Sequence, residues 1–235
     1  MTAAALRAEQ VSRSVVAAGS RFTLLIERFE VAQGARVAVT GPSGCGKSTL
    51  FALLALALRP DAGDVLTLAG TDALALWRAG RGDALAALRA RCVGFVPQTG
   101  ALLPFLNLRD NIQLPQAILG RPDPARVSVL AERLGIAAIL ERRPAAVSVG
   151  QRQRAAIARA LSHRPGVVLA DEPTASVHPA QADDILDLLT RTAAEDGAAL
   201  VITTHDAARA QAAGYAIAPC RPDADAAKTR FCWPA

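Results

Sequence analysis

The chain has 235 residues, of which 51% are hydrophobic and only 4% aromatic, so small and aliphatic side chains must fill its interior. Its longest apolar run, Leu50–Leu58, is too short for a helix that crosses a bilayer. The formal net charge of +5 is a mild excess that suits phosphate ligands, an anionic membrane face or nucleic acid.

The first 100 residues alternate between predicted strands and helices. Runs of apolar and β-branched residues predict four strands, over 22–29, 35–40, 64–70 and 93–96. A glycine-rich turn at 41–46 leads into an apolar helix predicted over 47–58, and a second helix is predicted over 83–91.

The middle of the chain, from about 99 to 163, has a different character. It contains five prolines between helical stretches, and we predict a mostly helical subdomain there. After it, buried strands are predicted over 166–170 and 199–204, with an amphipathic helix over 180–195 between them. The stretch from Pro219 onward is polar and poorly patterned. Strands that alternate with helices predict an α/β fold with a largely parallel sheet.

Residues 41–48, GPSGCGKS, fit the phosphate-loop pattern G-x-x-x-x-G-K-[ST] between a strand and a helix. Glycines let backbone N–H groups turn inward around phosphate oxygens, and the helix that begins near Lys47 adds the positive end of its dipole. We expect Lys47, one of only two lysines, to pair with the β- and γ-phosphates and the Ser48 hydroxyl to bind Mg²⁺. The predicted ATP-binding residues of the loop are Gly41, Pro42, Ser43, Gly44, Cys45, Gly46, Lys47, Ser48 and Thr49.

Two carboxylates follow the apolar strand predicted over 166–170. Asp171 and Glu172 lie just past its end, and in open α/β sheets that edge is where ligands bind. We expect Asp171 to hold Mg²⁺ through water. We expect Glu172 to act as a general base that orients and polarises the attacking water.

The four cysteines lack C-x-x-C spacing, which argues against a structural zinc site. Cys45 lies inside the glycine-rich loop, where a disulfide would be disruptive, so reduced thiols are the simplest interpretation. A thiol in this loop is also expected to be open to alkylating agents. The other cysteines are Cys92, Cys220 and Cys232.

In their order along the chain, the motifs resemble the ATP-binding cassette family, the nucleotide-binding subunits of ABC transporters, over about residues 6–218. Gln98 in GFVPQ resembles the family's Q-loop glutamine, and His205 in TTHD resembles its switch histidine. The resemblance implies that Gln98 contacts the metal or the attacking water and that His205 contacts the γ-phosphate. With Glu172, these two residues form the expected catalytic set, and Ser48, Gln98 and Asp171 the expected metal ligands.

The segment SVGQRQR at 148–154 resembles the family's signature motif. The resemblance implies that Ser148, Gly150 and Gln151 bind ATP held by the phosphate loop of a second subunit, in a head-to-tail pair. It also implies a P-loop NTPase core with an N-terminal antiparallel β-subdomain and a helical subdomain. We expect one ABC ATPase domain over 1–235, divided into 1–98 and 164–218 for the core with its β-subdomain, 99–163 for the helical subdomain and 219–235 for a C-terminal tail.

The resemblance further implies an integral membrane permease as partner, which holds the subunit peripherally at the cytoplasmic face of the inner or plasma membrane. No nucleic-acid partner is expected, because the chain lacks the zinc-type cysteine pairs and long coiled-coil insertion of related DNA-repair and translation ATPases. VGFVPQTGALLPFLNLRDNIQLP and LADEPT are similar to the lipoprotein-release and macrolide-export branch, which also includes the FtsE type (LolD/MacB/FtsE-like). Export of lipoproteins, lipids or drugs is the implied task, and the apolar segment 102–106 lies where the family docks its permease.

Several positions depart from the family's pattern. Val149 replaces the first glycine of the signature, His178 replaces the aspartate of the D-loop, and Val15 or Val16 stands where an aromatic residue stacks on adenine. These departures suggest a slow or specialised ATPase. An ATP-gated scaffold or regulatory subunit is therefore the alternative function, and both a homodimer and a heterodimer stay open.

Overall fold

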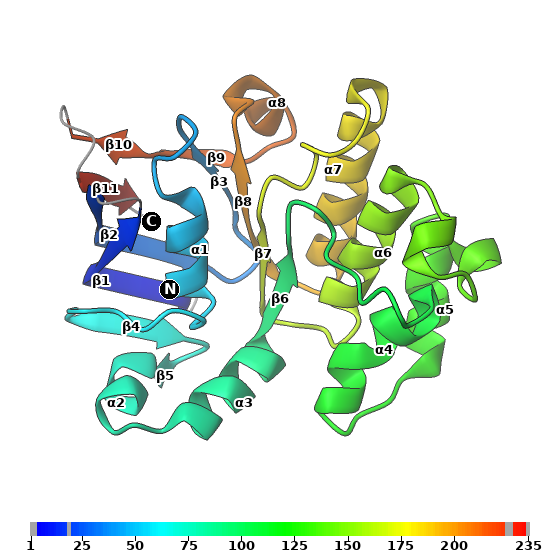
Figure 1. Ribbon diagram of the computed structural model, residues 1–235, viewed down its shortest axis with the longest axis horizontal. Coiled ribbons are helices and arrows are strands. Elements are labelled where there is room, and N and C mark those ends of the chain that lie inside the picture. The colour runs from blue at the N-terminus through cyan, green and yellow to red at the C-terminus, as the bar shows by residue number, and fades with distance from the viewer. Residues whose placement is uncertain (1–3, 18–19, 224–227, 234–235) are drawn as a thin grey trace.

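The computed structural model describes residues 4–17, 20–223 and 228–233 of the chain. Two sheets lie at one end of the molecule, with helix α1 between them, and a group of helices forms the other end (Figure 1). Within the described ranges, none of the helices has the length and apolar character that crossing a membrane requires.

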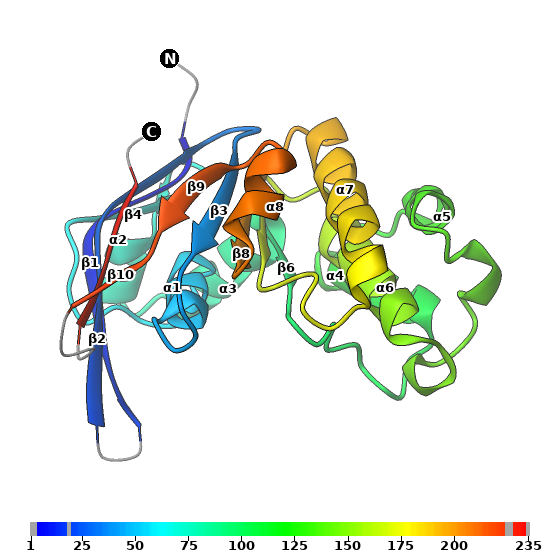
Figure 2. The same ribbon diagram turned by 90° about the horizontal axis from the view of Figure 1, so that it is seen from above.

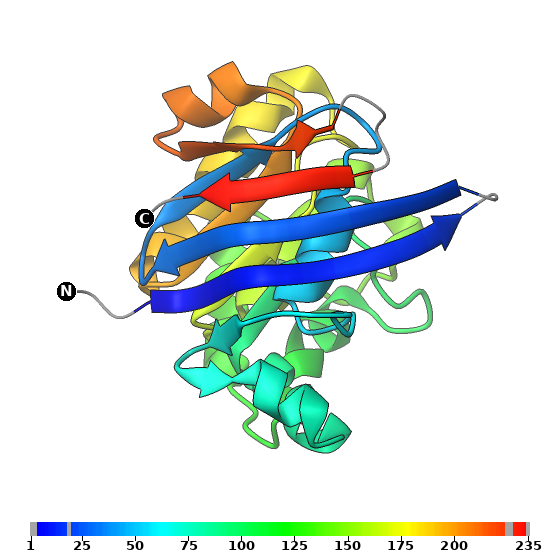
Figure 3. The same cartoon turned by 90° about the vertical axis from the view of Figure 1, so that its left-hand side faces the viewer.

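The first sheet has six strands in the order β10-β11-β2-β1-β4-β5 (Figure 3). Its strands are β1 Ala4–Ala17, β2 Ser20–Ala32, β4 Val65–Leu68, β5 Thr71–Asp72, β10 Arg221–Pro222 and β11 Lys228–Trp233. Neighbours run antiparallel except β11, which lies parallel to β2. Residues 228–233, near the C-terminus, therefore belong to the same sheet as the N-terminal strands β1 and β2.

The second sheet has five parallel strands in the order β6-β7-β8-β3-β9. They are β3 Arg36–Thr40, β6 Val93–Val96, β7 Val167–Ala170, β8 Ala199–Thr204 and β9 Ala216–Pro219. Both faces of this sheet are covered, which explains why its strands read as nearly continuous apolar runs. Because parallel strands end at one edge, the segments that follow β3, β6, β7 and β8 are brought together there.

Helices pack on both faces of the parallel sheet (Figure 2). They are α1 Lys47–Leu54, α2 Ala73–Arg78, α3 Gly82–Cys92, α4 Leu108–Ile118, α5 Pro124–Arg133, α6 Val149–Leu161, α7 Pro179–Glu195 and α8 Ala207–Ala212, with 3₁₀ turns at Ala137–Ile139 and Pro144–Ala146. Leu50, Phe51 and Leu54 of α1 are buried between the two sheets, in one hydrophobic cluster with both. On the opposite face, α4 to α7 share a second cluster with the parallel strands.

The expected α/β class is confirmed, with its largely parallel sheet, its N-terminal antiparallel sheet and its helical region. The helix predicted over 47–58 was too long: α1 ends at Leu54, and Leu56 adopts a left-handed φ of 56° that a helix cannot continue through. The stretch from Pro219, in which the sequence showed no pattern, contributes β10 and β11.

The division into 1–98, 99–163, 164–218 and 219–235 stays a prediction. Parts of it, at 1–3, 18–19, 224–227 and 234–235, lie outside the described residues.

Candidate active site

The predicted phosphate loop connects β3 to α1. Gly46 precedes the helix with a φ of 93°, which lies in the left-handed region that favours glycine. A Cβ at Gly46 would lie only 2.7 Å from Phe22 Cζ, so any other residue there would displace the Phe22 ring. Backbone conformation and packing therefore both favour glycine at the point where the loop enters the helix.

The Lys47 side chain folds back into this loop. Its Nζ donates hydrogen bonds to the carbonyl oxygens of Gly41 (2.9 Å) and Pro42 (3.0 Å), and it lies 3.9 Å from Glu172 Oε1. The side chain is only 6% exposed. A buried ammonium is tolerated only with such partners, so the loop keeps one positive charge at its centre.

A hydroxyl and a carboxylate link the start of α1 to the end of β7. Ser48 Oγ donates a hydrogen bond of 2.9 Å to Asp171 Oδ2. The other oxygen of Asp171 accepts from Thr203 Oγ1 at 2.6 Å, and Thr203 Oγ1 in turn accepts from the backbone N–H of Glu172 at 2.8 Å. Thr203, at the end of β8, thus fixes both carboxylate residues at once.

Glu172 lies at the centre of three potential donors. Gln98 Nε2 donates to its Oε2 at 3.3 Å, His205 Nε2 contacts its Oε1, and Lys47 Nζ faces the same oxygen. Its φ of 45° is a left-handed backbone conformation in a non-glycine residue, and such strain concentrates at functional sites. Three segments that are distant from Glu172 in the sequence therefore converge on its carboxylate.

A cavity of about 360 Å³ joins these groups. It is lined by Ser43, Gly44 and residues 46–49 of the loop, together with Gln98, Glu172, His205 and Phe22. Behind it, Ser176 Oγ donates to the Gln98 carbonyl oxygen at 2.9 Å, so the segment after Glu172 is tied to the segment after β6.

The predicted signature residues do not reach this cavity within one chain. Ser148 is the N-cap of α6 and forms a capping box with Gln151, in which each residue's side chain accepts from the other's backbone N–H (3.2 and 2.9 Å). Ser148 is exposed, and Val149, the first residue of the helix, is 44% exposed. The start of α6 is thus capped by its own residues and exposed.

His178, which departs from the family's D-loop pattern, is the N-cap of α7. Its ring Nδ1 accepts a hydrogen bond from the backbone N–H of Ala180 at 3.3 Å. The ring therefore takes over the capping that an aspartate side chain supplies at such a position.

The donors beside the loop suit Mg²⁺. A serine hydroxyl and an aspartate carboxylate lie next to each other, and Gln98 is close by. Among the described residues, no group of three or more His, Cys, Asp or Glu could hold a metal alone. Mg²⁺ takes one or two carboxylates from a protein and completes its shell with phosphates and water, so the Ser48–Asp171 pair fits this ion.

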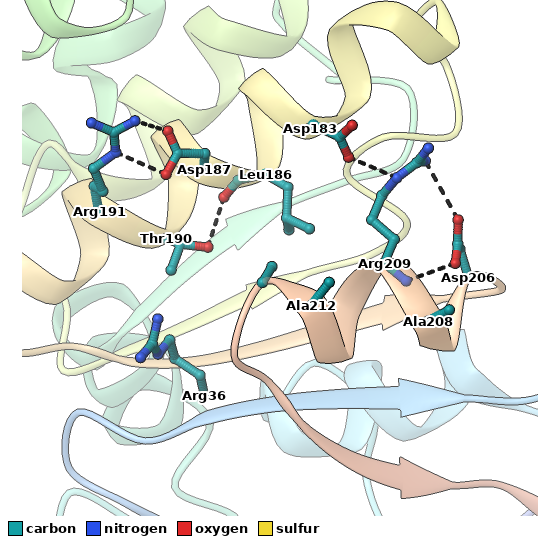
Figure 4. A pocket seen from close by; sticks show the side chains of 11 residues that line it. Arg36, Asp183, Leu186, Asp187, Thr190, Arg191, Asp206, Ala208, Arg209 and Ala212 are labelled. Atoms are coloured by element: carbon teal, nitrogen blue, oxygen red, sulfur yellow. Dashed lines mark hydrogen bonds and ion pairs between the residues drawn. The ribbon is translucent and has the colours of Figure 1, made fainter.

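A larger cavity, of about 710 Å³, lies away from this site, between α7, α8 and the start of β3 (Figure 4). Each of its carboxylates is paired with an arginine: Asp183 and Asp206 with Arg209, and Asp187 with Arg191. Its Thr190 hydroxyl donates to the carbonyl of Leu186 on its own helix. This cavity therefore offers no unpaired carboxylate or nucleophile, and the smaller cavity at the phosphate loop is the candidate active site.

The structure brings together the predicted loop, Gln98, Asp171, Glu172 and His205, and it leaves Ser148, Gly150 and Gln151 apart from them. Three residues with a place in the site were missed by the sequence analysis: Phe22, Thr203 and Ser176. Only Thr203 could have been found from the sequence. It is a polar residue at the end of an apolar strand, and Asp171 was predicted from the same kind of position.

Comparisons with known proteins agree with this geometry. The family described as "ABC transporter" matches residues 27–175. The lipoprotein-releasing system ATP-binding protein LolD of Novosphingobium aromaticivorans is 41% identical over 181 residues, 76% of this chain and 79% of the relative. LolD of Idiomarina loihiensis is 39% identical over 211 residues, 88% and 90% of the two chains.

Among solved structures, the dimeric ATP-binding cassette MJ0796 in a post-hydrolysis state, bound to ADP and Pi, superposes with a TM-score of 0.80 at 27% identity. The match covers 91% of this chain and 93% of that one. The chain therefore belongs to the ABC transporter family, and it is an ATP-binding, ATP-hydrolysing subunit of the LolD/MacB/FtsE-like branch.

Proposed function

We propose that this ABC ATPase powers a lipoprotein-releasing or similar export complex, as half of a head-to-tail dimer beneath a membrane permease at the cytoplasmic face of the membrane. The observation that carries the proposal is the convergence of Lys47, Gln98 and His205 on the Glu172 carboxylate. The high identity to relatives named as lipoprotein-releasing ATP-binding proteins supports the transport task.

The polar residues that meet at the cavity have distinct proposed roles in hydrolysis. The N–H groups of the loop and the Lys47 ammonium hold the β- and γ-phosphates. Glu172 accepts a proton from the attacking water, which Gln98 orients, and His205 donates to the γ-phosphate. Ser48, Asp171 and Gln98 would hold Mg²⁺, which supplies neutralisation of the phosphate charge.

The exposed N-terminus of α6 suits the second half of the site. Ser148, Gly150 and Gln151 lie outside the cavity of their own chain, and the positive end of the α6 dipole lies at this exposed helix start. In a head-to-tail pair they bind the γ-phosphate held by the partner's loop. The phosphate charge is then matched only when both chains meet, so ATP closes the pair and hydrolysis releases it.

An apolar groove beside the site is the proposed docking place for the permease. It has a volume of about 470 Å³ and is lined mainly by Ala86, Phe95, Pro97, Leu114, Pro115 and Ile118. Phe95 packs edge to face on Phe51 of α1, with ring centroids 6.4 Å apart. Of the segment 102–106, Phe105 is exposed while Leu102 packs on the core, so Phe105 is the residue of that segment best placed to contact the permease.

The function is tested with the full-length chain, alone and together with a lipoprotein-releasing type permease in detergent. We expect Mg²⁺-dependent phosphate release that the permease stimulates, and dimers in light scattering only with ATP. Tight ATP-dependent dimers without turnover, with or without permease, would instead support the ATP-gated scaffold.

Val149→Gly is expected to raise turnover about fivefold, the rate equivalent of about 1 kcal/mol of relieved crowding. Val149 stands exposed beside Ser148, so in the dimer its branched side chain faces the partner's γ-phosphate. Steady-state phosphate release measures the effect, and Val129→Gly is the matched control on another helix surface. Equal rates for Val149→Gly and wild type would show that the dimer accommodates the valine.

Phe22→Ala is expected to weaken ATP binding about tenfold, because base–aromatic stacking contributes about 1–3 kcal/mol. Phe22 pairs with Val15 across the β1–β2 hairpin. Val15 is one of the two positions at which the family's pattern has its adenine-stacking aromatic residue, so in this chain the neighbouring strand carries an aromatic ring instead. The Phe22 ring lines the cavity against Gly46 and is the proposed adenine contact.

Titration with a fluorescent ATP analogue gives the dissociation constant for Phe22→Ala, and the thermal midpoint shows whether the fold is retained. Val16→Ala is the control, since Val16 is 66% exposed on the same hairpin. If Val16→Ala weakens binding and Phe22→Ala does not, the base lies on the other strand.

A further inference from the structure

Two cysteines from segments 175 residues apart meet behind the phosphate loop. Cys45 belongs to the loop and Cys220 directly follows β9, and their side chains are only 4% and 7% exposed. The Cys220 thiol donates to the Cys45 carbonyl oxygen at 3.3 Å. Both sulfur atoms lie within 3.4 Å of the position that a Cβ at Gly41 would occupy, so both thiols pack against the same glycine of the loop.

Cys220 is held in this place by the backbone. Its N–H donates to the Thr40 carbonyl oxygen at 2.7 Å and so extends the parallel pairing of β3 and β9 beyond Pro219. Thr40 is also the last residue before the loop. The strand that leads into the loop therefore positions Cys220, and the two thiols meet without any rearrangement of the sheets.

The surroundings of the two thiols make them chemically unequal. The hydrogen bond from Cys220 and the nearby Lys47 ammonium lower the pKa of Cys45 against the opposing effect of burial. The same pairing, together with burial, raises the pKa of Cys220. Cys45 is thus the better nucleophile of the pair, and Cys220 keeps its proton.

We propose that Cys45 and Cys220 are a thiol pair that a peroxide converts into a reversible disulfide, and that this disulfide closes the phosphate loop to ATP. The consequence for ATP rests on the proposed nucleotide binding by the loop. The thiol pair itself rests on the contacts of Cys45, Cys220 and Gly41.

The chemistry balances with hydrogen peroxide as the two-electron oxidant. The Cys45 thiolate attacks one peroxide oxygen, the O–O bond breaks, and Cys45 becomes a sulfenic acid while hydroxide leaves and takes up a proton as water. Cys220 then attacks the sulfenic sulfur, the S–O bond breaks, and a second water leaves as the S–S bond forms. Two thiols are oxidised, and one peroxide is reduced to two waters.

The disulfide acts on the loop through Cys45. It replaces the thiol–carbonyl hydrogen bond by a covalent link about 2.05 Å long, which ties the loop to the end of β9. The N–H groups next to Cys45 then lose the freedom to turn around phosphate oxygens. The burial of Cys45 also corrects the expectation of an open loop thiol, because a bulky maleimide is hindered at a thiol that is only 4% exposed. Hydrogen peroxide is the oxidant of choice here because it is small.

The test uses the full-length chain, reduced, desalted and treated with hydrogen peroxide. Tryptic mass spectrometry is expected to find a Cys45–Cys220 peptide, and ATP affinity is expected to fall at least about tenfold and to return with dithiothreitol. Cys220→Ser should bind ATP like wild type when reduced and should lose the dithiothreitol-reversible part of the inhibition. Cys232→Ser, which removes the exposed cysteine of β11, is the control and should behave like wild type.

The proposal is overturned if peroxide oxidises Cys232 while no Cys45–Cys220 peptide forms, or if the peptide forms and ATP affinity stays within about twofold. Mass spectrometry reports the disulfide whether or not the reduced chain binds ATP. A failure of the proposed nucleotide binding is therefore distinguishable from a failure of the thiol pair.

Discussion

Glu172→Gln is expected to lower the ATP turnover of this chain by about 10²–10³-fold, the contribution of a positioned general base. The amide has the shape of the carboxylate but cannot accept the proton of the attacking water. Contacts to Gln98 and His205 can persist, because an amide still offers an oxygen and a donor. ATP binding is therefore expected to survive, and dimers should accumulate with Mg²⁺ and ATP. Phosphate release and light scattering measure the two effects.

Glu132→Gln is the matched control for this change, because Glu132 is an exposed residue of α5 far from the cavity. It should leave turnover and dimerisation as in wild type. Near-wild-type turnover of Glu172→Gln would show that Glu172 is not the base. His205, whose ring contacts the same carboxylate, would then be the next candidate.

The parallel sheet was predictable because its strands are buried on both faces. β3, β6, β7 and β8 appear in the sequence as short apolar runs, and the predicted ranges match the observed ones within a residue at each end. Their sheet order, by contrast, has no signal in a single sequence. It is the order β6-β7-β8-β3 that sets Gln98, Glu172, His205 and the loop side by side.

The N-terminal strand escaped prediction because its buried residues do not alternate regularly. Ala5, Leu6, Ala8 and Val11 are buried, at both odd and even positions, so the sequence lacks a clear period of two. Gln10 adds a local irregularity, with a φ of 51°. In β11 the inward residues are Thr229 and Phe231, and a buried threonine hides the alternation from a hydrophobic pattern.

Within the site, the sequence motifs predicted most of the residues that meet at the cavity, but not the residues that hold them in place. Thr203 links Asp171 to the backbone of Glu172, and Ser176 ties the next segment to Gln98. Such contacts depend on which strands lie next to each other in the sheet. The spacing of motifs along the chain does not give that order. For the same reason, the meeting of Cys45 with Cys220 emerges only in three dimensions.

Lys47→Ala is expected to weaken ATP binding about 100-fold or more and to reduce turnover below detection. Charge-assisted hydrogen bonds contribute about 1.5–3 kcal/mol each, and the ammonium serves more than one phosphate oxygen. Lys47 is buried among the Gly41 and Pro42 carbonyls and Glu172, so no other cation of the cavity lining can replace it there apart from a protonated His205.

The chain supplies its own control for this change, because Lys228 is the only other lysine and lies on β11 in the other sheet. Lys228→Ala should bind and hydrolyse ATP like wild type, while circular dichroism confirms that both variants are folded. An unchanged dissociation constant for Lys47→Ala would mean that phosphate is not held at this loop. The roles proposed for Ser48, Asp171 and Glu172 would then fail with it, since all three are placed relative to that phosphate.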